Sequence, residues 1–478
     1  EAELGRTGEA GWRRIYGPFE VEAQLLRAPS GRTLQGHVTL PGEARASFKL
    51  DQAKGAPLSV EGRAEAIPFQ SLPDVIASRL PAKLVGGTAG GHVKLEAPAD
   101  LSTATVTGSL ALRGLTVSNE RLAPEPVGPL DMAVDARASW TRKTRTLALE
   151  KGSVVLGKDR ATSLELLGEL HLVAERPFWI SLKAGPVSYP ALLASVPPQL
   201  APGPEVPRPE GPLGATARIA GDLDRPEAWN VEVKLELTGL KKAARTTPIP
   251  LAGPFAYEPQ ESVGKPRELW VGDKNPRFVP FAELPLYVSH AVTCSEDISF
   301  FTHQGFVFLE MRDAFVEATQ HKRLRGASTL TQQLAKNLYL SRERTFSRKA
   351  KEAFVTVMLE AALPKQRLME IYLNIIEWGP DVYGIGEAAP YYFGVDVREL
   401  TVKQAVYLAT IIPSPLRTHV FFDKGAINEV WEEKIRTVLT RMLDEGSITE
   451  AQFHEALAEP LLFRPKDTPL GEGPAAPR

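Results

Sequence analysis

The sequence predicts a multidomain α+β protein, in which a β-rich N-terminal half precedes a mainly α-helical C-terminal half. Its 478 residues exceed the roughly 250 to 300 residues that one hydrophobic core usually serves. Up to about residue 245, apolar and polar residues alternate with the period of two that is typical of strands. Beyond residue 285 the period becomes 3.6, which is typical of amphipathic helices.

The N-terminal half contains short alternating runs that Gly, Pro and Asp residues separate. This pattern predicts an antiparallel sheet with one buried face. We therefore expect residues 1–245 to form a β-rich domain of antiparallel strands and short helices. The runs are residues 37–40, 93–95, 106–112, 164–167 and 231–237.

Two segments of this half share an order of elements. Residues 57–81 and 177–198 each contain a strand, a Pro turn and a short apolar helix closed by Pro, and a Gly-rich turn and two strands follow each segment. The shared order predicts repeats over about 57–116 and 177–241, with chance similarity among short strands as the alternative. The unit resembles the AsmA-like repeat proteins of the bacterial envelope, whose curved sheets are associated with lipid handling. No cluster of titratable residues stands out here, so a scaffold, spacer or binding surface is expected.

Residues 246–285 contain Pro and Gly and are expected to form a linker. After it, apolar residues at helical spacing predict helices within 352–363, 367–373 and 401–412. We expect a helical domain over residues 286–465 and a disordered tail over 466–478.

The composition excludes several classes of function. A formal charge of −2 leaves no excess of cations to neutralise a phosphate backbone, so nucleic acid is not an expected partner. The single cysteine, Cys294, excludes an intramolecular disulfide and a cysteine metal cluster, and is expected to be a packed small hydrophobe. No run approaches the roughly 20 apolar residues that span a bilayer. Because the chain starts at Glu1 rather than Met, an upstream signal or anchor is compatible with it.

The stretch "RGASTLTQQLAKNLYL", residues 325–340, has an unusual polar composition. Leu330, Leu334 and Leu338 recur every fourth residue, which predicts an amphipathic helix. A solvated helix face usually mixes Glu and Lys, whereas this one carries hydrogen-bonding groups and one cation, and so indicates a binding surface. These groups are Ser328, Thr329, Thr331, Gln332, Gln333, Lys336 and Asn337.

Charged residues lie on both sides of this stretch. In "CSEDISFFTHQG", residues 294–305, Ser295 followed by two acids can be interpreted as a helix N-cap with first-turn acids. In "TFSRKAKEAF", residues 345–354, Arg348 and Glu352 are one helical turn apart while Lys349 is expected to point elsewhere, and a surface ion pair is the alternative. Four charged residues of this half together suit sugar transfer from a phosphate leaving group, which needs a carboxylate base and cations. They are Glu296, Lys336, Arg348 and Glu352.

Five motifs in the helical half resemble those of the peptidoglycan glycosyltransferases of family 51, the transglycosylase module of penicillin-binding proteins and of monofunctional transglycosylases. They are "EDISFFTHQG", "GASTLTQQLAKN", "RKAKE", "KQRLMEIYLN" and "GIGEAAPYYFG", in the family's order within about residues 280–460. "IIEWG", residues 375–379, favours the monofunctional branch. The resemblance implies a lysozyme-like helical fold that polymerises lipid II into glycan strands and releases undecaprenyl diphosphate.

The resemblance also implies roles for individual residues. Glu296 corresponds to the catalytic base that activates the acceptor hydroxyl, and Glu352 to a second essential glutamate that positions the donor diphosphate or its metal ion. His303 fits the first motif and is expected to be a structural hydrogen-bonding residue. The expected substrate-binding residues are Lys336, Arg348, Ser328, Thr329, Gln332, Gln333, Asn337 and Lys349.

The resemblance further implies a divalent cation, Mg²⁺ or Mn²⁺, no organic cofactor, and inhibition by moenomycin. The expected partners are lipid II, the growing glycan, the outer surface of the cytoplasmic membrane and other cell-wall synthesis proteins, at the periplasmic side of the inner membrane. The apolar segment 306–315 either packs into the core or dips into the bilayer surface, as its counterpart does in the family. The side chains expected to contact the membrane are Phe306, Phe308, Met311 and Phe315.

The sequence departs from the family pattern at three positions: Val307 replaces an acid, Ser299 a frequent basic residue and Ala327 a glycine. A catalytically inactive lipid-binding or scaffold protein is therefore one alternative. A lytic glycosidase is another, although it leaves the expected phosphate-binding cations without a role. No transpeptidase is expected, because the Ser-x-x-Lys at Ser262 and Lys265 has no Lys-Thr-Gly to accompany it.

Overall fold

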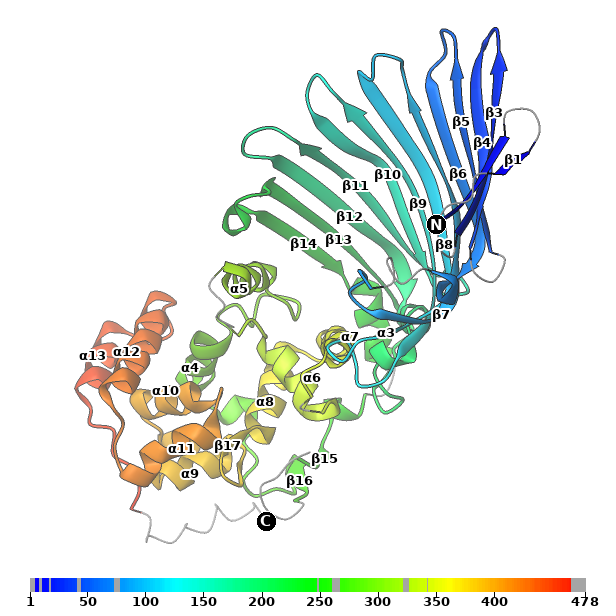
Figure 1. The fold of residues 1–478 in the computed structure, drawn as a ribbon. Helices are drawn as coiled ribbons and strands as arrows, with labels where there is room; N and C mark the ends of the chain where they lie inside the picture. Colours follow the sequence, from blue (N-terminus) through cyan, green and yellow to red (C-terminus); the bar gives the residue numbers. More distant parts are fainter. Residues whose placement is uncertain are drawn as a thin grey trace.

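The structure, a computed structural model, describes residues 5–7, 11–16, 19–40, 44–72, 78–246, 249–259, 267–320, 326–341 and 343–465. An antiparallel sheet forms the N-terminal half and helices form the C-terminal half, so the expected order of the two parts is confirmed (Figure 1). The expected disordered tail at 466–478 and the Ser262 and Lys265 pair lie outside the described residues.

The sheet contains fourteen strands among the described residues, and each strand pairs antiparallel with the next along the chain. All five predicted alternating runs fall mainly within strands. Such pairing builds the sheet from neighbouring hairpins. The strands are β1 (Gly5–Thr7), β2 (Gly11–Tyr16), β3 (Phe19–Ala28), β4 (Gly31–Thr39), β5 (Arg45–Ala53), β6 (Leu58–Pro68), β7 (Lys83–Ala97), β8 (Thr103–Ser118), β9 (Val127–Thr141), β10 (Thr146–Leu156), β11 (Thr162–His171), β12 (Pro177–Ser188), β13 (Pro212–Asp222) and β14 (Asn230–Glu236).

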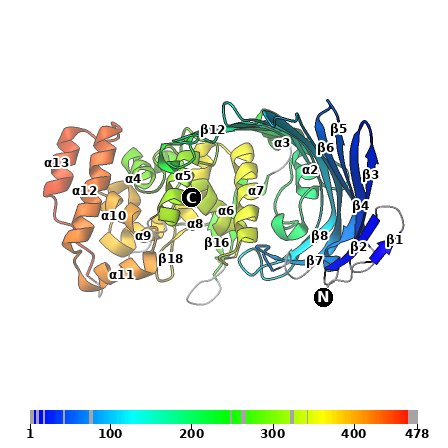
Figure 2. The same ribbon diagram turned by 45° about the horizontal axis from the view of Figure 1, so that its top comes forward.

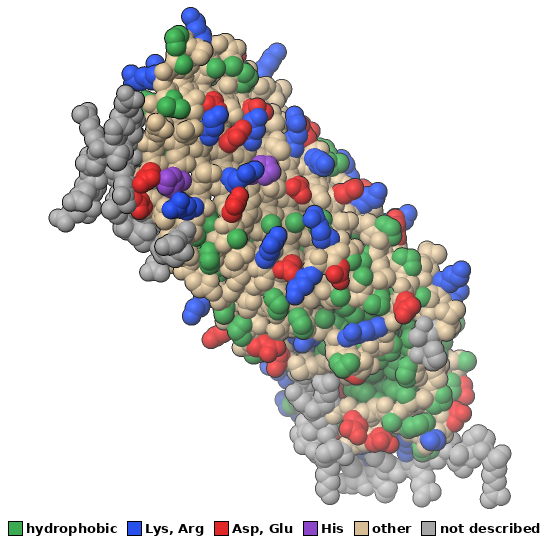
Figure 3. Space-filling view, turned by 90° about the vertical axis from the view of Figure 1, so that its right-hand side faces the viewer, with side chains coloured by type: hydrophobic (Ala, Val, Ile, Leu, Met, Phe, Trp, Pro, Cys, Tyr) green, Lys and Arg blue, Asp and Glu red, His purple; other side chains and the backbone are tan. Residues whose placement is uncertain are grey.

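The register separates an apolar face of the sheet from a polar face. Leu50 pairs with Leu34 on one side and with Val60 on the other, and alternate residues of a strand point to opposite faces. In the same strands Ser47 lies between His37 and Arg63, within the polar face. Figure 3 views the sheet from the side on which charged and histidine side chains gather.

The expected burial of the apolar face is wrong for much of the sheet. On that face Val93, Leu110 and Ile180 are 49%, 42% and 37% exposed. The sheet's share of the large hydrophobic core comes instead from its C-terminal end. There the short helix α2 (Tyr189–Ala194) and helix α3 (Thr238–Thr246) lie inside the curve of the sheet (Figure 2). The apolar face therefore remains half-exposed over the earlier strands.

The two expected repeats begin alike and end differently. In the first, β6 leads through a helical turn, η2 (Phe69–Ser71), to β7 and β8; in the second, β12 leads through α2 to β13 and β14. However, β8 continues as a strand through Ser118, whereas α3 begins at Thr238 inside "LELTGL". The internal repeat stays a prediction.

The segment 246–285 is not a linker where the structure describes it. Its short strands β15 (Phe255–Tyr257) and β16 (Leu269–Val271) pair with each other, between the helical turns η5 (Pro250–Ala252) and η6 (Phe281–Glu283). Leu251 and Val271 are buried, and the Arg367 guanidinium donates hydrogen bonds to the carbonyls of Leu251 and Gly253. The linker expectation fails because these apolar side chains enter the core.

The helical domain follows the predicted periodicity. The helices expected within 352–363, 367–373 and 401–412 lie in α7, α8 and α10. None of the described helices is both long enough and apolar enough to span a membrane. The helices are α4 (Leu286–Glu296), α5 (Phe308–Gln320), α6 (Leu330–Tyr339), α7 (Phe346–Ala362), α8 (Lys365–Ile375), α9 (Ile385–Phe393), α10 (Val402–Ile411), α11 (Pro415–Lys424), α12 (Glu429–Asp444) and α13 (Glu450–Ala458).

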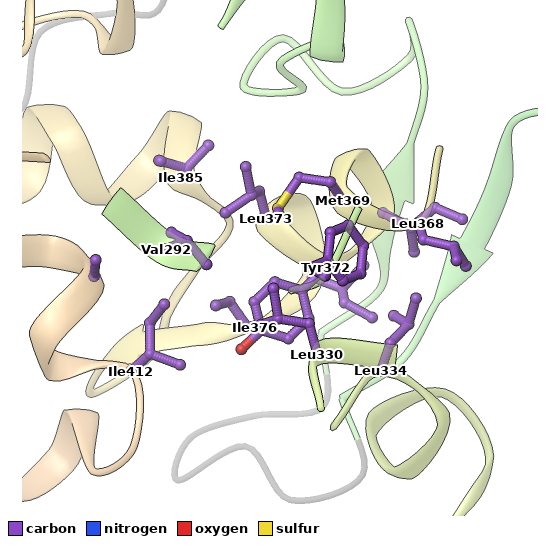
Figure 4. Close-up of a cluster of buried hydrophobic side chains, with 14 of the residues drawn as sticks. Val292, Leu330, Leu334, Leu368, Met369, Tyr372, Leu373, Ile376, Ile385 and Ile412 are labelled. Atoms are coloured by element: carbon purple, nitrogen blue, oxygen red, sulfur yellow. The ribbon is translucent and has the colours of Figure 1, made fainter. Parts of the chain in front are cut away.

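The two parts of the molecule share one hydrophobic core. Tyr189 and Leu240 from the N-terminal part belong to the same buried cluster as Leu330, Leu334 and Tyr372 of the helical domain. Figure 4 shows these last three side chains, from α6 and α8, within the buried cluster. The shared core fixes the sheet against the helices that carry the candidate site.

Candidate active site

Glu296 lies at the C-terminal end of α4, and Asp297 is the C-cap. The interpretation of Ser295 as an N-cap is therefore wrong. Buried Val288, Ala291 and Val292 pack the preceding turns into the core, so the helix lies before Ser295 rather than after it. At a helix C-terminus the macrodipole disfavours negative charge, so this position destabilises an ionised carboxylate.

The half-buried carboxyl of Glu296 is held by Gln333 of α6. Glu296 Oε2 accepts a hydrogen bond of 3.1 Å from Gln333 Nε2, and Gln333 Oε1 accepts one of 2.8 Å from the Tyr372 hydroxyl. Tyr372 is buried, so it fixes the amide with its NH₂ group toward the carboxylate. Burial raises the pKa of Glu296, and the Gln333 hydrogen bond partly opposes this. A carboxyl of raised pKa suits a general base.

Lys434 of α12 is a site residue that the sequence reasoning missed. Its Nζ donates a hydrogen bond of 2.6 Å to the Thr410 carbonyl, next to Ala409, whose carbonyl accepts a hydrogen bond from Ser295. Burial lowers the pKa of Lys434, and the charge of Glu296 opposes that effect; Lys434 in turn lowers the pKa of Glu296. In "WEEKIR", Lys434 is indistinguishable from a solvated helix charge, so only the tertiary packing identifies it.

Glu352 of α7 is almost fully buried between two cations. Its side chain is 3% exposed, and its two oxygens accept hydrogen bonds from Arg348 and Lys349. The expectation that Lys349 points elsewhere is wrong, because residues three and four positions apart both lie on one helix face. Lys349 also donates a 3.0 Å hydrogen bond to Ser328 Oγ. Two cations around one carboxylate leave a net positive charge, which suits a phosphate group.

Part of the polarity at the start of α6 serves the helix itself. Thr329 and Gln332 form a capping box, in which each side chain accepts a hydrogen bond from the other residue's amide, and both residues are buried. Buried Thr331 donates to Glu360. These three side chains are therefore engaged inside the protein. Ser328, Gln333, Lys336 and Asn337 are half-buried.

The loop between α4 and α5 is organised by Asp297. Its carboxylate accepts hydrogen bonds from His303 Nε2 and from the Leu330 amide at the start of α6 (both 2.9 Å). The Gly305 amide donates to His303 Nδ1, so that nitrogen carries no proton and the structural role expected for His303 is supported. Gly305 has φ +88° and a Cβ there would lie 2.6 Å from Thr356 Cγ2, which excludes a side chain.

The apolar segment before and within α5 is only partly packed. Phe306 and Phe308 are half-buried and stack with ring centroids 5.8 Å apart, whereas Met311 is 39% exposed. The side chain of Phe315 is outside the described residues. Arg312 Nη1 donates a 2.6 Å hydrogen bond to the Trp229 carbonyl, so α5 also contacts the sheet. Membrane contact by this segment stays a prediction.

The residues present do not fit a metal ion held by the protein. Within the described ranges, no group of three or more His, Cys, Asp or Glu side chains could hold one. Both Glu352 oxygens already accept hydrogen bonds from cations, so a metal ion would have to displace Arg348 or Lys349. The assignment of Glu352 as a metal ligand is therefore not supported by its surroundings.

Both candidate carboxylates are tied to the segment around α6: Glu296 to Gln333 in the helix, and Glu352 through Lys349 to Ser328, which directly precedes the N-cap. A helical domain with this site agrees with a family comparison, in which the transglycosylase family model matches residues 265–443. The match begins after β14 and so does not include the sheet.

Similar proteins include two that are named transglycosylases and one penicillin-binding protein. A biosynthetic peptidoglycan transglycosylase of Nitrosospira multiformis is 40% identical over 167 residues, covering 35% of this chain and 71% of that protein. One of Laribacter hongkongensis is 44% identical over 167 residues, covering 35% and 72%. Penicillin-binding protein 1A of Aquifex aeolicus is 37% identical over 195 residues, covering 41% of this chain and 26% of that protein. The chain belongs to the transglycosylase family.

Proposed function

We propose that this protein is a peptidoglycan glycosyltransferase that polymerises lipid II into glycan strands, with Glu296 as the general base. The observation that carries the proposal is the pairing of a desolvated carboxyl, Glu296, which is held by α6, with a cation cluster around Glu352, which contacts Ser328 just before α6. This combination suits the activation of a hydroxyl beside a phosphate leaving group. Family membership supports the same reaction.

In the proposed step, Glu296 accepts the proton of the acceptor sugar's 4-hydroxyl. The acceptor oxygen forms a bond to the donor anomeric carbon, and the bond from that carbon to the diphosphate oxygen breaks. The bonding pair leaves with undecaprenyl diphosphate, and the configuration at the donor carbon inverts. Gln333 holds the Glu296 carboxyl in place, so the base is already oriented when the acceptor arrives.

The leaving diphosphate is stabilised by cationic side chains in this proposal. Arg348 and Lys349 are positioned by Glu352, and half-buried Lys336 lies in the last turn of α6. Ser328 Oγ accepts a hydrogen bond from Lys349, and Asn337 follows Lys336 in α6. In this proposal the chain's own cationic residues supply the stabilisation.

Thr329 and Gln332 have a different role from the substrate contact that the resemblance implies. Their side chains complete the N-terminal turn of α6, which contains Gln333 and directly follows Ser328. We assign them to shaping the site. The lytic glycosidase alternative leaves the cation cluster unexplained, because a glycan leaving group carries no phosphate.

The proposal extends to the protein's surroundings in the cell. Lipid II and the growing glycan would place the reaction at the periplasmic surface of the inner membrane. Exposed Met311, with its neighbour Leu309 at 49% exposure, offers α5 as a contact with that surface. Transpeptidase activity is not part of the proposal, and moenomycin should inhibit the polymerisation.

Polymerisation of labelled lipid II tests the proposal. Wild-type protein should lengthen glycan strands, and Glu296→Gln, which keeps the shape and removes the base, should not. Shortened glycan would favour the lytic alternative. Binding of lipid II without any polymer from the wild type would favour the inactive scaffold.

A further inference from the structure

The N-terminus of α7, the helix that carries the cation cluster, is completed by a loop of the sheet domain. The first four amides of an α-helix lack partners within the helix. The first two amides of α7 find theirs outside it: Phe346 N–H donates to the Arg121 carbonyl (3.0 Å) and Ser347 N–H to the Leu122 carbonyl (2.8 Å). The acceptors lie in the loop between β8 and β9, more than 220 residues earlier in the chain.

Asn119 holds this loop in the shape that presents the two carbonyls. Its Oδ1 accepts a hydrogen bond of 2.8 Å from the Arg121 amide, and its own carbonyl accepts one of 2.9 Å from the Leu122 amide. Its Nδ2 donates to the Pro81 carbonyl at 2.8 Å, which ties the loop to the start of β7. Such side-chain-to-backbone bonds are how Asn fixes turns.

A second contact from the sheet domain holds α7 further along. The hydroxyl of fully buried Tyr189, at the start of α2, donates a 3.0 Å hydrogen bond to the Phe354 carbonyl. The two contacts lie on either side of the segment that contains Arg348, Lys349 and Glu352. The sheet domain therefore grips α7 before and after the cation cluster.

We propose that the sheet domain is a positioning element of the diphosphate site, acting through the Asn119 loop and Tyr189. This inference rests on the proposed function for the role of the cluster. Arg348 and Lys349 are the third and fourth residues of α7, so a change in its first turn moves both side chains directly. The transglycosylase family match begins at residue 265, so it does not include the sheet-domain residues that make these two contacts.

Asn119→Ala in the full chain tests the loop, and Gln70→Ala is the matched control. Gln70 lies in the turn η2 of the sheet domain, and its side chain donates a 3.1 Å hydrogen bond to the Val85 carbonyl. Like Asn119 it bonds to a sheet-domain carbonyl, but its hydrogen bond is not part of the contact with α7. We expect Asn119→Ala to lower kcat/KM about fivefold, the size of one lost helix cap, while Gln70→Ala matches the wild type. Asn119→Asp retains the Oδ acceptor and should recover part of the loss.

Two readouts separate positioning from general stability and do not depend on turnover. Hydrogen exchange at the Phe346 and Ser347 amides should accelerate in Asn119→Ala and not in Gln70→Ala. Affinity for undecaprenyl diphosphate in detergent micelles should fall about fivefold in Asn119→Ala. Tyr189→Phe, which keeps the buried ring and removes the hydroxyl, should weaken the same binding.

Unchanged amide exchange, or faster exchange with unchanged undecaprenyl diphosphate binding, would overturn the inference. A wild type that forms no polymer would overturn the proposed function instead. In that case the exchange and binding measurements still decide whether the sheet domain positions the cluster.

Discussion

The sheet and the helical domain differ in how their charged groups are placed. On the sheet, Lys49 has a raised pKa and Asp51 a lowered one because they hydrogen-bond to each other at the surface. In the helical domain, burial is the first cause of the shifts at Glu296, Lys365 and Lys434. The difference teaches that, among the residues that the structure describes, the charged side chains with burial as the first cause of their pKa shift lie in the part with a dense core, where catalysis can use them.

Replacing the base should have the largest effect. Glu296→Gln should lower kcat for lipid II polymerisation by about 10² to 10⁴, because a positioned general base contributes that much. Asp51→Asn on the sheet is the control, since its surface ion pair faces solvent. Polymerisation by Glu296→Gln at the wild-type rate would show that Glu296 is not the general base.

Neutralising the second carboxylate should affect both stability and activity. Glu352→Gln leaves Arg348 and Lys349 without their counter-charge, which should lower the free energy of unfolding by about 2 kcal/mol. We place the cost below that of a fully buried pair because the Lys349 side chain is 39% exposed. Chemical denaturation measures it. An unfolding free energy equal to the wild type's would mean that solvent screens this cluster like the pairs on the sheet.

Removing the neighbouring cation should shift the pH dependence of catalysis. Lys434 lowers the pKa of Glu296, so Lys434→Met should raise that pKa further. Because the base must be ionised, the acidic limb of the kcat/KM profile should move to higher pH. A pH series on wild type, Lys434→Met and the charge-retaining Lys434→Arg measures this. A limb at the wild-type position in Lys434→Met would contradict the proposed coupling.

Replacing exposed apolar side chains in each of the two regions should have the smallest effect. Leu309→Ser with Met311→Ser should weaken binding to anionic phospholipid vesicles severalfold, as measured by sedimentation. Burial of each apolar side chain in the membrane surface stabilises the bound state by about 1 to 2 kcal/mol. Leu167→Ser with Ile180→Ser makes the same change on the sheet, where these residues are 45% and 37% exposed. Equal losses in both pairs would show that α5 is not a dedicated membrane contact.

Periodicity predicted the helices and strands but not the contacts that they make with distant residues. The helices α7, α8 and α10 and the strands follow from local patterns, because neighbouring residues decide period and pairing. The expected linker at 246–285 is instead packed, since its apolar residues have partners such as Arg367 far along the chain. The Ser295 cap failed because core packing of Val288, Ala291 and Val292 places the helix before Ser295, and this burial outweighs the local preference of the two acids.

The sequence by itself determined the order of the two parts, the family motifs and the candidate residues Glu296, Arg348 and Glu352. These are properties of composition, spacing and residue type. Only the tertiary structure decided that Gln333 holds Glu296, that Lys434 lowers the pKa of Glu296, and that Thr331 is engaged by Glu360. It also joined the Asn119 loop to α7. Hydrogen bonds and burial between residues distant in the chain arise only on folding, and they decide which polar groups stay available for chemistry.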